Sequence, residues 1–270
     1  MITSVKKFDT RKLKTTGESH MSTALISGAT SGLGRAFIDA VLKRYPETDE
    51  LILLALEEDL LVELKICAGQ SCTNCHNMGN PDEFEKVKTV LEEEKPDIRL
   101  VINSAGISRI EPFAESDIQK QLAVVDVNDK GTMMVTKTCL PYMKEGSEII
   151  LIGSGSGYAP NPNQLVYSAT KAFVIHFSVG LREELKKRGI NVMVVNPGRM
   201  KTGMEHMPGS EHFSWFHNLL PASDINMVAE HSLKESAMGR WIFTPGVFYK
   251  IARIGTMWLP RNIAAKLNTM

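Results

Sequence analysis

Residues 23–34 read Thr23-Ala-Leu-Ile-Ser-Gly-Ala-Thr-Ser-Gly-Leu-Gly34, a short apolar run that passes directly into a glycine-rich turn. A helical pattern follows from Arg35 to Arg44. A strand that turns sharply into a helix can aim backbone N–H groups at a phosphate, and glycine allows both the tight turn and the close approach. The glycine spacing is G-x-x-x-G-x-G rather than the G-x-G-x-x-G of the general dinucleotide fingerprint. By itself the stretch is typical of either a dinucleotide site or a plain turn.

The rest of the chain alternates between apolar runs and helical patterns. Strand-like runs cover 50–55, 98–103, 148–153 and 190–195, and helix-like patterns cover about 57–66, 81–94 and 167–188. Strands that are apolar on both sides are typical of a parallel sheet covered by helices on both faces. We therefore predict an α/β fold built on a single doubly wound parallel sheet, with the polar motifs at the carboxyl ends of its strands.

The length of 270 residues suits one large α/β domain or two small ones. We predict one domain over residues 21–245 and a helical arm packed on it over 246–270. Residues 1–20 carry five cations and almost no apolar periodicity, and we expect them to form a disordered basic extension.

The charge totals do not suggest nucleic acid or an acidic surface as a partner. Lys+Arg and Asp+Glu both count 31, so no net field indicates nucleic acid. No apolar run approaches the ~20 residues of a membrane span, and the first residues do not resemble a signal peptide. We expect a cytoplasmic protein.

Three of the four cysteines cluster in Cys67-Ala-Gly-Gln-Ser-Cys72-Thr-Asn-Cys75-His76. The C-x-x-C-H pattern occurs in c-type haem attachment, but that chemistry needs export and no export signal is visible. Zinc or a redox pair remains an alternative, although the ligands would come from one short loop with no second knuckle. We interpret the segment as reduced thiols on a loop and predict no metal site.

Tyr167-Ser-Ala-Thr-Lys171 places a phenol and an ammonium on one helix face, because positions i and i+4 are neighbours. Neither group is reactive alone at neutral pH, since tyrosine titrates near ~10 and lysine near ~10.4. A neighbouring cation favours the phenolate and lowers the tyrosine pKa, which would make the hydroxyl a usable proton donor or acceptor. The alternative is an ordinary exposed helix face.

Taken together, these motifs resemble the classical short-chain dehydrogenase/reductase (SDR) family from about Thr23 to Phe243. The matching motifs, in order, are Ser27-Gly-Ala-Thr-Ser-Gly-Leu-Gly34, Asn103-Ser-Ala-Gly106, Asn128, Ser154, Tyr167-x-x-x-Lys171, and Pro197-Gly198 with Thr202. The resemblance implies a Rossmann-like fold and an oxidoreductase that interconverts a secondary alcohol and a ketone with NAD or NADP.

The resemblance also implies a catalytic set. Ser154 would hydrogen-bond the substrate oxygen, and Tyr167 would give it a proton or take one from it. Lys171 would lower the Tyr167 pKa and hold the nicotinamide ribose, and Asn128 would hold a water in the proton relay.

The cofactor site is implied in three groups. The residues implied to contact the phosphates are Gly28, Thr30, Ser31, Gly32, Leu33 and Gly34. Those implied to contact the adenosine are Asn77, Asn103, Ala105 and Gly106. Those implied to contact the nicotinamide end are Pro197, Gly198, Met200 and Thr202, with Tyr167 and Lys171. At the end of the second strand, Ala55-Leu-Glu-Glu58 offers no cation for a 2′-phosphate. This favours NAD over NADP, although Arg35 could offset the preference.

The substrate end is less specific. Residues 204–217 are rich in methionine and aromatic side chains, which indicates an apolar substrate, steroid-like or acyl-like. His206, His212 and His217 are read as polar surface groups of this segment. The alternative function is a catalytically silent dinucleotide-binding sensor or scaffold. The presence of Ser154, Tyr167 and Lys171 argues against it.

Two expectations concern larger partners. The resemblance implies a homodimer or homotetramer. From Val247 onwards, Phe248, Ile251, Ile254 and Trp258 predict an amphipathic helix. We interpret it first as an arm packed over the substrate cleft or on a partner subunit, with a membrane-surface helix as the alternative.

Overall fold

The computed structural model describes residues 22–46, 48–55, 81–200 and 221–267. Within these parts, six strands form one sheet in the order β2-β1-β3-β4-β5-β6. Every neighbouring pair is parallel. The strands are β1 (Thr23–Ser27), β2 (Glu50–Leu54), β3 (Ile98–Asn103), β4 (Met143–Ile152), β5 (Asn191–Val195) and β6 (Ile242–Phe243). The predicted single parallel sheet is confirmed.

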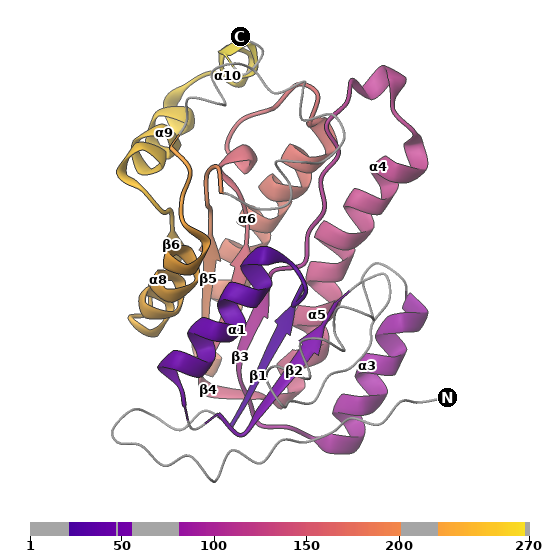
Figure 1. Cartoon of the computed structure of the whole chain (residues 1–270), viewed down its shortest axis with the longest axis vertical. Coiled ribbons are helices and arrows are strands. Elements are labelled where there is room, and N and C mark those ends of the chain that lie inside the picture. Colours follow the sequence, from indigo (N-terminus) through magenta and orange to yellow (C-terminus); the bar gives the residue numbers. More distant parts are fainter. Residues whose placement is uncertain (1–21, 47, 56–80, 201–220, 268–270) are drawn as a thin grey trace.

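Helices cover both faces of this sheet (Figure 1). The longer ones are α1 (Gly32–Arg44), α3 (Pro81–Glu94), α4 (Ile118–Val125), α5 (Gly131–Cys139), α6 (Leu165–Leu185), α8 (Ile225–Ala237), α9 (Val247–Trp258) and α10 (Arg261–Leu267). α1 and α8 pack on one face, whereas α3, α5 and α6 pack on the other. No helix within the described parts combines the length and apolarity that crossing a bilayer requires.

Strand residues alternate between two apolar clusters, as a pleated sheet requires. In β3, Val101 joins the cluster under α3, α5 and α6, and the next residue, Ile102, joins the cluster under α1 and α8. Both side chains are fully buried. This two-sided burial explains why the strands read as continuous apolar runs rather than as alternating ones.

The register brings the strand ends to one edge. Ser27, the last residue of β1, pairs with Leu54 of β2 and with Asn103 of β3. Asn103 pairs in turn with Leu151 of β4. The loops that follow these strands therefore start side by side, and the sequence motifs lie on those loops.

Several sequence expectations lie outside the described residues. Among them are the basic extension over 1–20, the helix over about 57–66 and the Cys67–His76 segment. The division of the chain into a domain over 21–245 and an arm over 246–270 stays a prediction, although α9 and α10 do follow β6 in the order expected.

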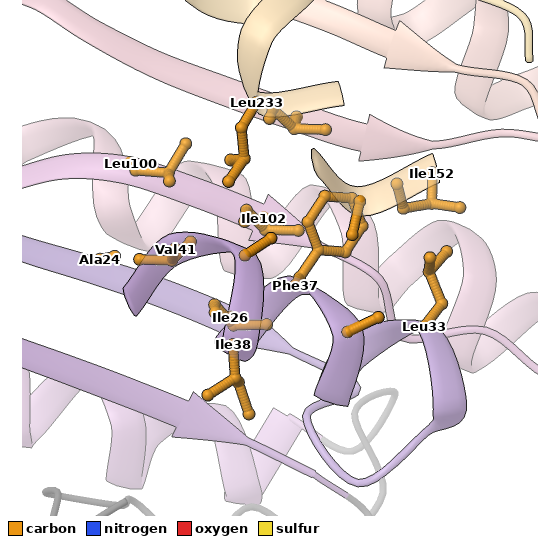
Figure 2. Packing of buried hydrophobic residues seen from close by; sticks show 14 of the residues in the cluster. Ala24, Ile26, Leu33, Phe37, Ile38, Val41, Leu100, Ile102, Ile152 and Leu233 are labelled. Atoms are coloured by element: carbon orange, nitrogen blue, oxygen red, sulfur yellow. The ribbon is translucent and has the colours of Figure 1, made fainter. Parts of the chain in front are cut away.

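Phe37 is the largest side chain of α1 that the sheet buries completely (Figure 2). We expect Phe37→Ala to lower the free energy of unfolding by about 3–5 kcal/mol, because it removes buried area and leaves a cavity. Urea unfolding measures this loss. Phe113→Ala is the matched control, since that ring is 50% exposed; equal losses for the two variants would contradict the packing described.

Candidate active site

Two glycines of the turn after β1 are required by its internal packing. Gly28 has a positive φ of 69°. A Cβ there would lie 2.6 Å from the backbone nitrogen of Ala105, and a Cβ at Gly34 would lie 2.0 Å from the Gly28 carbonyl oxygen. The turn therefore folds tightly onto the start of α1 and onto the loop after β3.

Gly32 and Ser31 face outwards at the amino end of α1. The nearest described atom to a Cβ at Gly32 would be Ile225 Cδ1, at 3.8 Å, so packing does not require glycine here. Ser31 caps the helix by accepting a hydrogen bond from the Gly34 amide at 3.0 Å, and the first turn carries no acidic residue. An exposed helix amino end of this kind suits an anion, so these residues fit a dinucleotide pyrophosphate.

Leu33 and Thr30, which we also expected to contact the phosphates, each make another contact within the protein. Leu33 is 5% exposed and its side chain belongs to the apolar cluster under α1. The Thr30 carbonyl accepts a hydrogen bond from Arg35 Nε at 3.2 Å. Any contact that Leu33 makes with a phosphate would therefore come from its backbone.

Asn103 and Ser27 form a buried polar pair between β1 and β3. The Ser27 hydroxyl donates to Asn103 Oδ1 at 2.7 Å and accepts from the Ala105 amide at 3.3 Å. Asn103 Nδ2 donates to the Thr132 carbonyl at 3.2 Å. The Asn103 side chain therefore links β3 to Ser27 of β1 and to Thr132 of α5, and its expected contact with the adenosine stays a prediction.

Asn128 lies in a π-helical turn, Asp126–Lys130, that joins α4 to α5. Its side-chain amide is fully engaged: Oδ1 accepts from the Ile107 amide at 2.9 Å, and Nδ2 donates to the Ile107 carbonyl at 3.0 Å and to Thr170 Oγ1 at 2.9 Å. The Thr170 hydroxyl donates onward to the Tyr167 carbonyl at 2.8 Å. A single buried amide thus connects the loop after β3 to the helix that carries Tyr167.

Lys171 is 4% exposed and lies where three segments meet. Its Nζ donates to the Ile152 carbonyl at 2.8 Å and is 5.7 Å from the centre of the Tyr167 ring. A Cβ at Gly106 would be 3.3 Å from the same Nζ. Burial lowers the pKa of Lys171 to about 8, against the opposing effect of the Asp129 charge.

Tyr167 differs from expectation in its ionisation. Burial of its hydroxyl raises the pKa of Tyr167, and a hydrogen bond with Ser154 opposes this rise. The sequence led us to expect that Lys171 lowers the Tyr167 pKa. In the structure the ammonium is hydrogen-bonded to the end of β4 instead, so the dry surroundings of the phenol decide the direction.

Ser154 follows the carboxyl end of β4 and caps the short helix Gly155–Gly157, where its Oγ accepts from the Ser156 amide at 3.1 Å. The Gly155 amide donates to the Pro197 carbonyl at 2.9 Å. The structure therefore brings the Pro197–Gly198 motif next to the turn that holds Ser154. Asn77 and Thr202, expected at the two ends of the cofactor, lie outside the described residues, as do the residues of 204–217.

Tyr249 of α9 is a site residue that sequence reasoning did not identify. Its hydroxyl accepts from the Arg199 amide at 3.0 Å and donates to the Pro221 carbonyl at 2.9 Å. Its ring lies over Gly198, where a Cβ would come within 2.0 Å of it. Met200 pairs with Ser223 in an isolated bridge beside this contact. One tyrosine within an amphipathic helix gives no sequence signal for such a role.

Residues 22–211 match the family model described as short chain dehydrogenase. The chain belongs to this family. It is 33% identical over 187 residues to sulfoacetaldehyde reductase 2 of Chromohalobacter salexigens, covering 66% of this chain and 72% of that protein. It is 31% identical over 179 residues to an NADP-dependent 3-hydroxy acid dehydrogenase of Salmonella typhimurium, covering 64% and 71%.

The fold agrees with that of a solved short-chain dehydrogenase. The crystal structure of such an enzyme from Burkholderia cenocepacia, in complex with NADP, matches with a TM-score of 0.75. The match covers 93% of this chain and 99% of that one at 24% identity. The family assignment and this likeness confirm the predicted SDR membership, the Rossmann-like sheet and an NAD(P)-dependent oxidoreductase.

The short-chain dehydrogenase described here carries an acidic residue, Asp129, directly after Asn128. Burial raises the pKa of Asp129 from 3.8 to about 7, while the charge of Lys171 acts to lower it. Its Oδ1 is buried and has no hydrogen-bond partner among the described residues. An acid whose pKa is raised on folding holds its proton more tightly in the folded chain, so its contribution to stability falls as pH rises from 3.8 towards about 7.

Asp129→Asn should remove this pH-dependent loss. We expect the variant to gain stability over the parent at about pH 8 and to gain less at about pH 5. Urea unfolding at the two pH values measures the difference. Asp126→Asn is the control, because that carboxylate pairs with Lys130 at the surface of the same turn. Identical gains for the two variants at both pH values would contradict the argument.

Tyr249→Phe keeps the ring over Gly198 and removes only the hydroxyl. We expect a loss of about 1–3 kcal/mol in the free energy of unfolding, because the Arg199 amide and the Pro221 carbonyl lose a shared partner. Tyr142→Phe is the matched control, since no hydrogen bond of its hydroxyl is found among the described residues. Urea unfolding that gives equal values for both variants would rule out a structural role for the Tyr249 hydroxyl.

Proposed function

We propose that this short-chain dehydrogenase interconverts a secondary alcohol and a ketone with Ser154, Tyr167 and Lys171 as its catalytic residues. The observation that carries the proposal is their convergence at the carboxyl edge of the sheet. Lys171 Nζ lies 5.7 Å from the Tyr167 ring centre, and Ser154 opposes the rise in the pKa of Tyr167. The anion-binding turn of α1 opens at the same edge, because β1, β3 and β4 end in register.

Tyr167 is proposed as the proton donor in the reducing direction. Because burial raises its pKa, the hydroxyl is protonated at neutral pH and can donate to a carbonyl oxygen. Ser154 would hold the same oxygen through its hydroxyl and so fix the distance between the carbonyl and Tyr167. In the oxidising direction Tyr167 would accept the proton of the alcohol.

Lys171 is proposed to bind the nicotinamide ribose through its ammonium group. A pKa of about 8 leaves it largely charged near neutral pH. Asn128 is proposed as a positioning residue, because its amide holds the loop at Ile107 and the helix at Thr170. The water-holding role implied for Asn128 remains part of this proposal.

The NAD(P) molecule would be held by the turn at Gly28–Gly34, the loop at Ala105–Gly106 and the Pro197–Met200 segment. When bound, it would give a hydride to the reacting carbon in reduction or accept one from it in oxidation. Asn77 and Thr202 stay predicted contacts. The preference for NAD rests on Glu57 and Glu58, which lie outside the described residues. The NADP in the names of the Salmonella and Burkholderia relatives gives that preference no support.

Two observations favour different classes of substrate. The methionine and aromatic residues of 204–217 favour a steroid-like or acyl-like body. The names of the two sequence relatives point instead to small anionic carbonyl compounds. Parallel assays of NADH and NADPH consumption with steroid, acyl, aldehyde and 3-oxo acid panels separate these classes. Binding of NADH or NADPH without turnover on any panel would favour the sensor or scaffold alternative.

A homodimer or homotetramer is proposed from the surface of α4, α5 and α6. Large apolar side chains are exposed there, namely Ile118, Leu122, Met133, Leu165 and Val179. Faces of this kind are typical of subunit contacts. We propose a cytoplasmic location for the oligomer.

Tyr167→Phe should lower kcat by about 10²–10⁴-fold, because the proton donor is lost while the ring remains. Binding of NADH or NADPH, followed by cofactor fluorescence, should stay within a few-fold of the parent value. Ser156→Ala is the control, since this serine is adjacent to the site and outside the proposed set. Turnover by Tyr167→Phe at the parent rate would refute the assignment.

A further inference from the structure

The helix α9 presents an apolar stripe to solvent rather than to the protein. Val247, Ile251, Ile254 and Trp258 recur at helical spacing and are 73%, 65%, 53% and 86% exposed. Residues at positions i, i+4, i+7 and i+11 lie along one side of a helix. We call these four residues the outer stripe. Tyr249, on the opposite side, is buried against the body of the protein.

The helix that carries the outer stripe is anchored to the body of the protein. The inner side of α9 is fixed by the Tyr249 hydroxyl, which binds Arg199 and Pro221, and by Arg253, which donates to Thr244 Oγ1 at 3.2 Å. The helix therefore has a defined orientation, and that orientation turns its large apolar residues outwards. Contiguous exposed apolar surface on a folded protein marks an interaction site.

Charge around the outer stripe is of one sign. Residues 245–270 contain no Asp or Glu and carry four cations, Lys250, Arg253, Arg261 and Lys266. The whole chain has a formal charge of 0, so this segment contributes +4 and the remainder contributes 0 − 4 = −4. Lys250 and Arg261 are exposed beside the stripe. The cationic C-terminal segment therefore coincides with the exposed apolar helix.

We propose that α9 and α10 form a docking surface for an anionic lipid bilayer, with the outer stripe inserted at the headgroup level and the flanking cations on lipid phosphates. An in-plane helix with large apolar residues on one side and Lys or Arg at its border binds membranes in this way. A tryptophan such as Trp258 suits the interface between headgroups and acyl chains. A second copy of the chain would place the exposed cations Lys250, Arg261 and Lys266 against their own counterparts, which disfavours self-association through this face.

The docking surface lies at one end of the molecule, where α9 and α10 follow β6 (Figure 1). The bilayer would therefore contact the end of the protein that carries the C-terminal helices and leave the amino ends of the strands in water. The inference does not depend on the proposed reaction, because it uses no residue of the proposed catalytic set.

Vesicle co-sedimentation of the full chain tests the proposal. We expect binding to phosphatidylglycerol/phosphatidylcholine vesicles and little binding to phosphatidylcholine alone. Trp258→Ala should weaken partitioning at least about tenfold, because it removes a large inserted side chain. Lys250→Glu should weaken it by about fivefold or more, since each interfacial cation contributes about 1 kcal/mol. Added salt should weaken binding of the parent chain.

Matched controls separate the docking surface from general stickiness. Trp241→Ala removes another tryptophan, 49% exposed, that precedes β6. Lys187→Glu reverses an exposed cation after α6, away from the docking surface. Both should bind vesicles as the parent does.

Four results would overturn the proposal. The first is absence of parent binding to anionic vesicles. The second is equal loss of binding in the Trp241 and Trp258 variants. The third is a change of oligomeric state in Trp258→Ala, by light scattering, with vesicle binding intact; this would assign the face to a second copy. The fourth is lost NADPH or NADH turnover in Trp258→Ala with vesicle binding intact, which would give the face a role in the reaction instead.

Discussion

The buried amide of Asn128 is the interaction on which the arrangement of the site depends. Its two polar atoms join the loop at Ile107 to Thr170, and Thr170 joins that link to the backbone of Tyr167. Leaving such an amide unpaired costs about 1–3 kcal/mol per buried group, so the loop and the helix are held in one relative position. The π-helical turn is what aims Asn128 at both partners, and irregular turns of this kind are frequent at functional sites.

Lys171 shows the energetic cost of that arrangement. A lysine that is 4% exposed disfavours its own charge, which is why its pKa falls to about 8. The Ile152 carbonyl and the charge of Asp129 offset part of this cost. The rest of this free-energy cost is offset by the packing of the two apolar clusters, one on each face of the sheet. These clusters hold β4 and α6 in place independently of the site.

The sequence predicted what is local or strongly patterned. Apolar runs gave the parallel sheet because both of its faces are buried, and Gly28 and Gly34 gave the turn because no other residue fits there. It missed Thr170 and Tyr249, whose roles arise from contacts with residues 42 and 50 positions away. It also gave no sign that the Asn103 amide bonds Ser27 and Thr132, and the cofactor contact expected of Asn103 stays a prediction. Motif spacing fixes where a side chain is, whereas its hydrogen-bond partners follow only from the packing.

Tyr249 connects the two regions that the sequence treated separately. Its ring requires glycine at 198, and its hydroxyl holds the backbone on both sides of the 201–220 segment at Arg199 and Pro221. Helix α9 therefore helps to hold the backbone at the proposed site. Because the same helix carries the outer stripe on its opposite side, Tyr249 links the proposed bilayer-facing surface to the Pro197–Met200 segment.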